Sequence, residues 1–122
     1  MDNATAISSN LGDAELTFAG HSLGGGLAAA NSLATGKDAI TFNAAALSQV
    51  TKDGLNLTNR NGSIFNVVVR GEILNYGQSM AGMKLESTPY YLKASYLPNP
   101  VGMAQRVHNH MMGVVIKKLK NQ

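Results

Sequence analysis

The chain has 122 residues, 44% of them hydrophobic and 14% charged, which suits one globular domain with a single buried core. It has no cysteine, which excludes a disulfide framework, a cysteine nucleophile and any metal site that needs thiolates. The net charge of +3 is mild, and no apolar run approaches the ~20 residues of a membrane span.

The first third of the chain is predicted to pass from a polar segment through a strand into a helix. Residues 1–13 are polar and turn-rich, so we expect an irregular segment in which 4–7 ends a helix at most. Residues 15–19 form a short apolar run rich in strand formers, which predicts a buried strand. Small and apolar residues at helical spacing over 23–34, closed by Gly36, predict a helix.

The middle of the chain carries two further strand signals around an irregular connection. Residues 39–42 are predicted to form the second strand. Residues 48–62 contain two glycines and three asparagines, which indicates a loop with one helical turn at most. The stretch 63–74 is the clearest strand signal, with a β-branched centre at 67–69.

The last third is predicted to contain a further candidate strand and a closing helix. Residues 90–96 are the candidate strand, and Pro98 and Pro100 then break the chain. A terminal helix is expected over about 110–120 because apolar residues recur there at helical spacing. This alternation predicts one α/β domain over 1–122, with a mostly parallel sheet of three to four strands flanked by helices.

The sequence Gly-His-Ser-Leu-Gly at residues 20–24 matches G-x-S-x-G and lies where strand is predicted to turn into helix. A serine on such a sharp turn has a strained backbone, so we expect Gly20 and Gly24 to be needed for their missing side chains. The turn lifts the Ser22 hydroxyl above the sheet edge, beside the positive end of a helix. The backbone N–H of Leu23 is then an oxyanion donor. The alternative is a glycine-rich turn, or a phosphate-cradling loop, without a nucleophile.

Longer stretches resemble one known family. The sequence GHSLGGGLA resembles the nucleophile elbow of the class 3 lipases, within the α/β-hydrolase superfamily. The stretches DAITFNAAAL, NVVVRGEIL and HNHMMGVVIKKL resemble that family's next strand, its acid-bearing strand, and its histidine with the closing helix. The resemblance covers most of 14–119 and implies a partial α/β-hydrolase fold that corresponds to the C-terminal half.

A serine nucleophile needs a base, and the chain offers three histidines. His21 is adjacent to Ser22, so we expect its ring to point away from the serine hydroxyl and to be structural. His108 and His110 both precede the closing helix. The resemblance favours His110, because an apolar pattern follows it, and we expect it in that helix's first turn; His108 stays the alternative.

The base in turn needs an acid to orient it. Glu72 follows the strand centred on 67–69, at the place where the resembled family has an aspartate, and glutamate also serves in this superfamily. Asp53 is a distant alternative.

The predicted nucleophile arrives by residue 22, which leaves no upstream room for the other strands of a complete α/β-hydrolase sheet. The strand at 15–19 would then have an unpaired side. We therefore expect a homo-oligomer or a missing upstream segment.

The leading hypothesis is a serine ester hydrolase, lipase- or phospholipase-like, that cleaves a lipid or acyl ester through an acyl-enzyme without metal or cofactor. The alternative is a catalytically silent module or fragment that serves in binding or assembly, or as a toxin piece, and needs another segment for activity. Lys117, Lys118 and Lys120 are interpreted as a solvated helix end. We expect no nucleic-acid partner, because no aromatic residue interleaves with these lysines. Contact with a membrane surface stays open, as does the compartment: no signal region is apparent.

Overall fold

A computed structural model describes residues 2–11, 15–55, 62–70, 72, 74, 77–78, 84–85, 87–93 and 101–121. The helices are α1 (Asp2–Leu11), α2 (Leu23–Thr35), α3 (Gln49–Asp53), α5 (Val101–His110) and α6 (Met112–Lys120). The strands are β1 (Thr17–His21), β2 (Asp38–Phe42), β3 (Ile64–Val69) and β4 (Tyr90–Leu92). None of the helices in the described part is long and apolar enough to cross a membrane.

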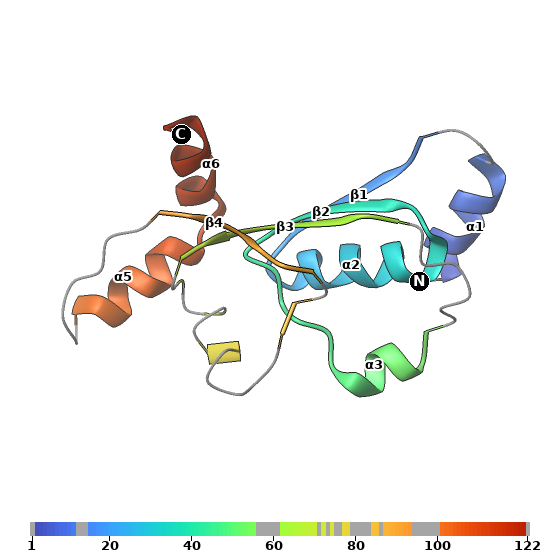
Figure 1. Ribbon diagram of the computed structural model, residues 1–122, viewed down its shortest axis with the longest axis horizontal. Coiled ribbons are helices and arrows are strands. Elements are labelled where there is room, and N and C mark those ends of the chain that lie inside the picture. Colours follow the sequence, from blue (N-terminus) through green and yellow to red (C-terminus); the bar gives the residue numbers. More distant parts are fainter. Residues whose placement is uncertain are drawn as a thin grey trace.

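The four strands form one parallel sheet in the order β1-β2-β3-β4, which confirms the predicted α/β class. The helix α2 packs against β1 and β2, while α6 packs against β3 and β4. Figure 1 shows α2 on one side of the sheet and α6 on the other. Because all strands run in the same direction, their carboxyl ends share one edge, and α5 meets α6 at that edge (Figure 1).

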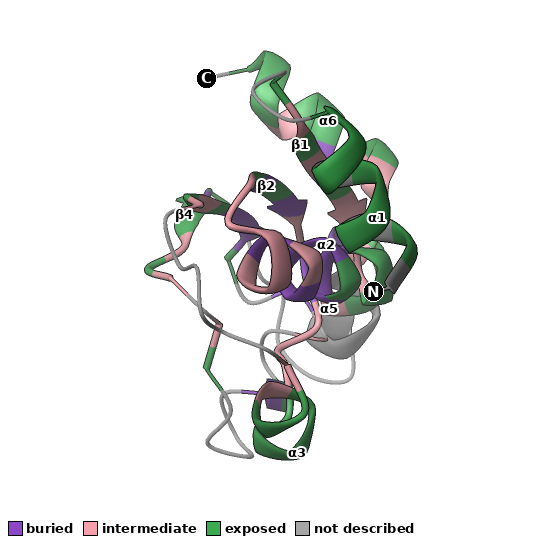
Figure 2. Ribbon diagram, turned by 90° about the vertical axis from the view of Figure 1, so that its right-hand side faces the viewer, coloured by how far each residue is buried: buried purple, intermediate pink, exposed green. Residues whose placement is uncertain are grey.

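The core has two parts, one on each face of the sheet. On the face of the sheet that α2 covers, this helix contributes buried alanines and glycines, which allow it to lie close to β1 and β2. On the opposite face, Val115 of α6 packs against Val67, Val69 and Leu92, and Phe42 and Met112 lie at the margin of this cluster. Figure 2 shows that buried residues concentrate in α2 and the sheet, whereas α1, α3 and α6 are largely exposed.

Most predicted elements are present with shifted ends. The strand predicted at 15–19 occurs at Thr17–His21, because its pairing with β2 begins at Thr17 and Asp38. The helix α2 ends where expected: Gly36 has φ 73° and donates its N–H to the Ser32 carbonyl. Of the candidate strand at 90–96, residues 90–92 are β4, and 94–96 lie outside the described residues. The helical turn within 48–62 is α3, and 56–61 likewise lie outside them.

Two helices were missed. The prediction of an irregular N-terminal segment is wrong over 2–11, where the chain forms α1 and packs against α2. This contact outweighs the weak helix propensity of its Asn, Ser and Thr residues. The second missed helix is α5, which begins at Val101, directly after the prolines at 98 and 100. Proline predicts a break in the chain, but it is also common at the start of a helix.

Candidate active site

Ser22 stands at the turn between β1 and α2 with φ 58° and ψ −122°, a conformation that few non-glycine residues adopt. The turn is held from both sides of the serine. Its N–H donates to the Phe42 carbonyl at 3.0 Å, which ties it to the end of β2. Its carbonyl accepts from the N–H groups of Gly26 and Ala45, at 3.2 and 2.9 Å. These bonds fix a strained backbone that would otherwise relax.

The Ser22 hydroxyl is free of the role that serine usually has at this position. It is the N-cap of α2, yet its side chain makes no capping hydrogen bond to the helix. Its Oγ lies 2.8 Å from Nε2 of His110 instead. The turn therefore directs the hydroxyl to an imidazole from the far end of the chain.

The glycines of the turn differ in importance. A Cβ at Gly20 would lie 2.1 Å from the carbonyl oxygen of Gly24, which no small backbone movement can relieve. At Gly24 a Cβ would meet nothing within 4 Å, so the expectation that this position must lack a side chain is wrong. It is wrong because Gly24 already belongs to α2 and its missing side chain points away from the turn.

Two further glycines bring α2 close to the loop that follows β2. A Cβ at Gly25 would lie 2.7 Å from the Ala44 side chain, and one at Gly26 would lie 2.8 Å from the Ala45 carbonyl. The helix therefore packs against this loop, and the Ala45 N–H thereby reaches the Ser22 carbonyl.

Leu23 is the first residue of α2, so its N–H is one of the amide groups that the helix itself leaves without a partner. It directly follows the serine, at the positive end of the helix dipole.

The second ring nitrogen of His110 contacts Glu72. Nδ1 lies 2.5 Å from Oε2 of Glu72, and the same oxygen accepts the N–H of Leu74 at 2.9 Å. The Glu72 side chain is 0% exposed, and that of His110 is 17% exposed. Because a carboxylate oxygen can only accept, Nδ1 is the donor to Glu72, and the other ring nitrogen, Nε2, faces the Ser22 hydroxyl.

Two segments that are far apart in the sequence, the end of β3 and the end of α5, meet to make this arrangement. Glu72 follows β3, and its N–H donates to the Val69 carbonyl at 3.0 Å. His110 is the last residue of α5, so the expectation that it lies in the first turn of the closing helix is wrong. The closing helix begins two residues later, at Met112, because Met111 has an extended backbone.

The two alternative candidates lie elsewhere. His108 is exposed on α5, and its carbonyl accepts the N–H of Met111. Asp53 ends α3, is exposed, and accepts a hydrogen bond from Gln49 at 2.7 Å. The structure therefore brings together Ser22, His110 and Glu72, and neither alternative takes part in that chain of contacts.

Two residues beside these three were not identified from the sequence as part of the site. His21 donates from Nε2 to the His110 carbonyl at 2.6 Å, and the two rings are 5.0 Å apart. Asn43 is fully buried with φ 46°; its amide donates to the carbonyls of Asn109 and His110, and its oxygen accepts the Val69 N–H. An asparagine directly after a predicted strand can indicate a left-handed backbone, and this was the signal in the sequence that could have pointed to Asn43.

Among the described residues, no group of three or more His, Asp or Glu side chains is arranged to hold a metal ion. The arrangement holds a hydroxyl, an imidazole and a carboxyl group in a row, and such a row can activate the hydroxyl as a nucleophile.

Two comparisons with known proteins bear on this site. The family model described as phospholipase-like, a Tle-like phospholipase domain, matches residues 1–114. The curated "Extracellular phospholipase A1" of Serratia liquefaciens is 54% identical over 54 residues. Those residues are 44% of this chain and 17% of that relative, so the matched part is less than a fifth of the relative's length.

Proposed function

Because the chain belongs to the family of Tle-like phospholipase domains, we propose that it is a serine hydrolase that cleaves an acyl ester of a phospholipid. The contact between the Ser22 hydroxyl and Nε2 of His110 is the observation that carries this proposal. The name of the Serratia relative supports phospholipids as the substrate class. We also propose that the serine turn is a nucleophile elbow of the class 3 lipase type, which the sequence GHSLGGGLA resembles.

In the proposed reaction, the Ser22 oxygen attacks the ester carbonyl carbon while Nε2 of His110 takes the hydroxyl proton. Glu72 keeps the imidazole in the required orientation and stabilises its charged form. The carbonyl oxygen becomes an oxyanion, and the Leu23 N–H donates to it. As the bond to the alcohol breaks, His110 returns the proton to that alcohol. Water then attacks the acyl-enzyme, again with His110 as base, which releases the fatty acid and restores the serine.

A fluorophosphonate probe and a series of p-nitrophenyl esters test this proposal. We expect the probe to label Ser22, and ester turnover to fall to the uncatalysed level in Ser22→Ala, a loss of up to about 10⁶-fold. Ser48→Ala is the matched control: this exposed serine caps α3 and should leave labelling and turnover unchanged. A chain that neither labels at Ser22 nor exceeds the Ser22→Ala rate would refute the hydrolase proposal.

The chain on its own also suits a second proposal, a silent module that becomes active with another segment. One observation favours it: Ile40, Phe65 and Tyr90 are exposed on one face of the sheet, and β1 has β2 as its one neighbour among the described strands. We propose that a second copy of the chain, or an upstream segment, covers this face. Within this proposal, residues 1–122 are one partial α/β-hydrolase domain, and a second oxyanion donor comes from the covering part.

A further inference from the structure

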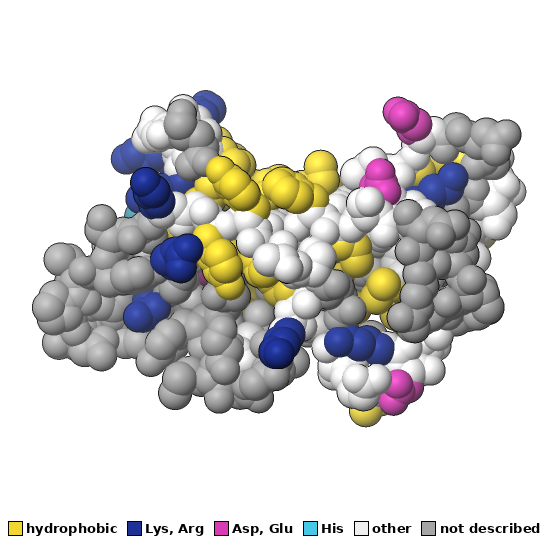
Figure 3. Space-filling model, viewed as in Figure 1, with side chains coloured by type: hydrophobic (Ala, Val, Ile, Leu, Met, Phe, Trp, Pro, Cys, Tyr) yellow, Lys and Arg dark blue, Asp and Glu magenta, His cyan; other side chains and the backbone are white. Residues whose placement is uncertain are grey.

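Positive charge gathers at the end of the molecule that holds the site. Six of the ten Lys and Arg residues lie just after β3 and β4 or in α5 and α6: Arg70, Lys93, Arg106, Lys117, Lys118 and Lys120. Figure 3 shows Lys and Arg side chains gathered at the end of the molecule where α6 and β4 lie, with most of the visible carboxylates elsewhere on the surface. The described carboxylate at this end is Glu72, which is buried against His110. A negatively charged ligand is therefore attracted to the end that carries Ser22.

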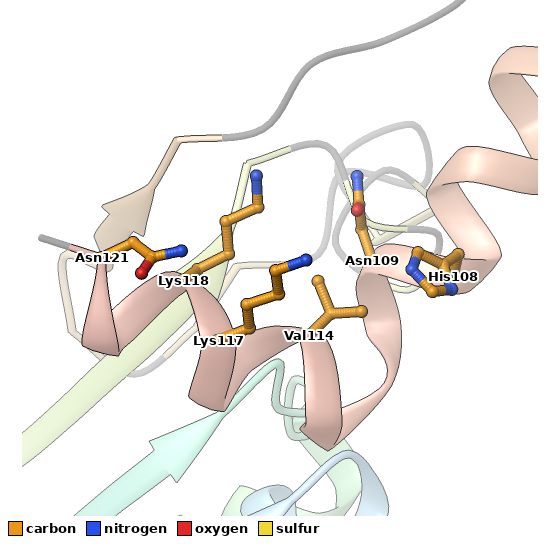
Figure 4. A pocket seen from close by; sticks show the side chains of 6 residues that line it. All are labelled: His108, Asn109, Val114, Lys117, Lys118 and Asn121. Atoms are coloured by element: carbon orange, nitrogen blue, oxygen red, sulfur yellow. The ribbon is translucent and has the colours of Figure 1, made fainter.

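An open cavity of about 210 Å³ lies within this basic region. It is lined by His108, Asn109, Val114, Lys117, Lys118 and Asn121. Figure 4 shows Lys117 and Lys118 extending from α6 on the side where Asn109 and His108 lie. No described carboxylate is within ion-pair distance of either lysine. The cavity thus combines two ammonium groups with imidazole and amide groups, a set rich in hydrogen-bond donors.

The position of this cavity relates it to the reaction. His108 and Asn109 directly precede His110 in α5, so the cavity wall and the proposed base belong to the same turn of helix. The helix α6 also exposes Met111 beside its first turn, and Ile116 and Leu119 along its length. Lysines next to exposed apolar side chains are typical of helices that lie at a lipid surface.

We propose that this cavity binds the phosphate group of a phospholipid, with Lys117 and Lys118 as the cationic contacts. The proposal rests on the function proposed above and specifies where the substrate's headgroup is held. Lysine binds phosphate as a point charge, and the neighbouring His and Asn side chains can donate hydrogen bonds to its oxygens. A headgroup held there is bound beside the turn of α5 that carries His110.

The test measures binding by Ser22→Ala, so that no lipid is consumed and no catalytic activity is needed. Two kinds of vesicle with matched surface charge are compared, one containing phosphatidylglycerol and the other the carboxylate lipid oleate. Diffuse electrostatic attraction binds the protein equally to both kinds of vesicle, whereas a phosphate-binding site binds it more tightly to the phosphatidylglycerol vesicles. We expect at least about fivefold tighter binding to phosphatidylglycerol, the effect of about one well-placed cation.

Two single substitutions on α6 separate the cavity from the general charge. Lys117→Gln and Lys120→Gln each remove one charge from the same helix, but only Lys117 lines the cavity. Lys117→Gln in the Ser22→Ala background should abolish the preference for phosphatidylglycerol. Lys120→Gln should weaken binding to both vesicles by the same factor and leave the preference intact.

A further arm identifies the source of the phosphate. Inorganic phosphate that displaces the protein from phosphatidylglycerol vesicles better than chloride of equal ionic strength would show that the cavity also takes the free ion. Phosphate no better than chloride would restrict the site to the lipid headgroup. Equal binding to both vesicles, or a preference that survives Lys117→Gln, would overturn the proposal. Failure of Ser22 to react with fluorophosphonate would refute the hydrolase proposal alone, because the binding assay does not use that hydroxyl.

Discussion

Asn43 links the segment that carries the proposed base to the strand that precedes the proposed acid. Its amide nitrogen donates to the carbonyls of Asn109 and His110 at 3.0 and 3.1 Å, and its oxygen accepts the Val69 N–H at 2.8 Å. His21 donates a hydrogen bond to the same His110 carbonyl. The side chains of Asn43 and His21 thus hold the backbone carbonyl of His110, and neither occupies the ring nitrogen that faces Ser22.

Asn43→Gly is the substitution that isolates this amide, because glycine accepts the positive φ of 46° without strain. It leaves the buried Val69 N–H without its acceptor, which should lower the free energy of unfolding by about 1–3 kcal/mol. It also releases the His110 backbone, and a displacement of about 1 Å should slow fluorophosphonate labelling of Ser22 by about 10²-fold.

The control for Asn43→Gly is a variant that is destabilised but has an intact site. Val68 is buried on the α2 side of β3, so Val68→Ala should lower stability by a comparable amount. Denaturant unfolding measures both stabilities. If Val68→Ala labels as slowly as Asn43→Gly, the amide has no positioning role beyond general stability.

At this scale the sequence was informative where the chemistry has a local pattern. The G-x-S-x-G pattern singled out Ser22, and the resemblance to a known family favoured Glu72 and His110; the structure brings these three side chains into one line of contacts. Asn43 and His21 could not be found in that way. Their partners lie 67 and 89 residues away, so nothing nearby in the sequence marks the contacts that they make.

At the scale of the elements, the start of α2 is closely packed. Gly20 at the end of β1 touches the backbone of Gly24, and Gly25 and Gly26 touch the loop after β2. Three elements therefore meet around Ser22 at distances that leave no room for side chains. Of the four glycines from Gly20 to Gly26, only Gly24 has open space at the place of its missing side chain.

Gly20→Ala and Gly24→Ala are a matched pair four residues apart with opposite expected results. The first places a Cβ 2.1 Å from a backbone oxygen, so it should destabilise the protein by about 3 kcal/mol or more, in the range of severe core overpacking. The second fills open space within a helix and should stabilise it by up to about 1 kcal/mol. Thermal unfolding of the two variants against the parent measures both; equal losses would contradict the observed packing.

The bounds of β2 and α2 were predicted to within about two residues, whereas β3 ends at Val69 and fills only the first half of the predicted stretch 63–74. The strands β2 and β3 and the helix α2 have β-branched runs, small-residue periodicity or a glycine terminator, and these act over short distances. The helices α1 and α5 lack such signals. The helix α1 contacts α2, and the α5–α6 junction is fixed by bonds from His21 and Asn43. These are tertiary effects that periodicity does not contain.

At the scale of the whole molecule, the two faces of the sheet are covered unequally. The helix α2 covers one face, and α6 covers the carboxyl half of the other. Phe65 remains 53% exposed, Tyr90 47% and Ile40 37%, with the rings of Phe65 and Tyr90 6.1 Å apart. Figure 3 shows hydrophobic side chains gathered across the centre of the molecule. Contiguous apolar surface of this kind favours association.

We therefore expect the isolated chain to have a solution mass above its monomer value of 12.8 kDa. Phe65→Glu should shift the protein toward the monomer, because it places a charge on the exposed apolar face. Val50→Glu is the control, since Val50 is 82% exposed on α3 and away from the sheet. Sedimentation equilibrium measures the mass; a monomer at every concentration would contradict association through this face.

The contact between Ser22 and His110 joins side chains 88 positions apart. Closing so long a loop is entropically costly, and it is achieved only when α5 is in place against the sheet. A chain that ended before residue 110 would have no imidazole beside the Ser22 hydroxyl.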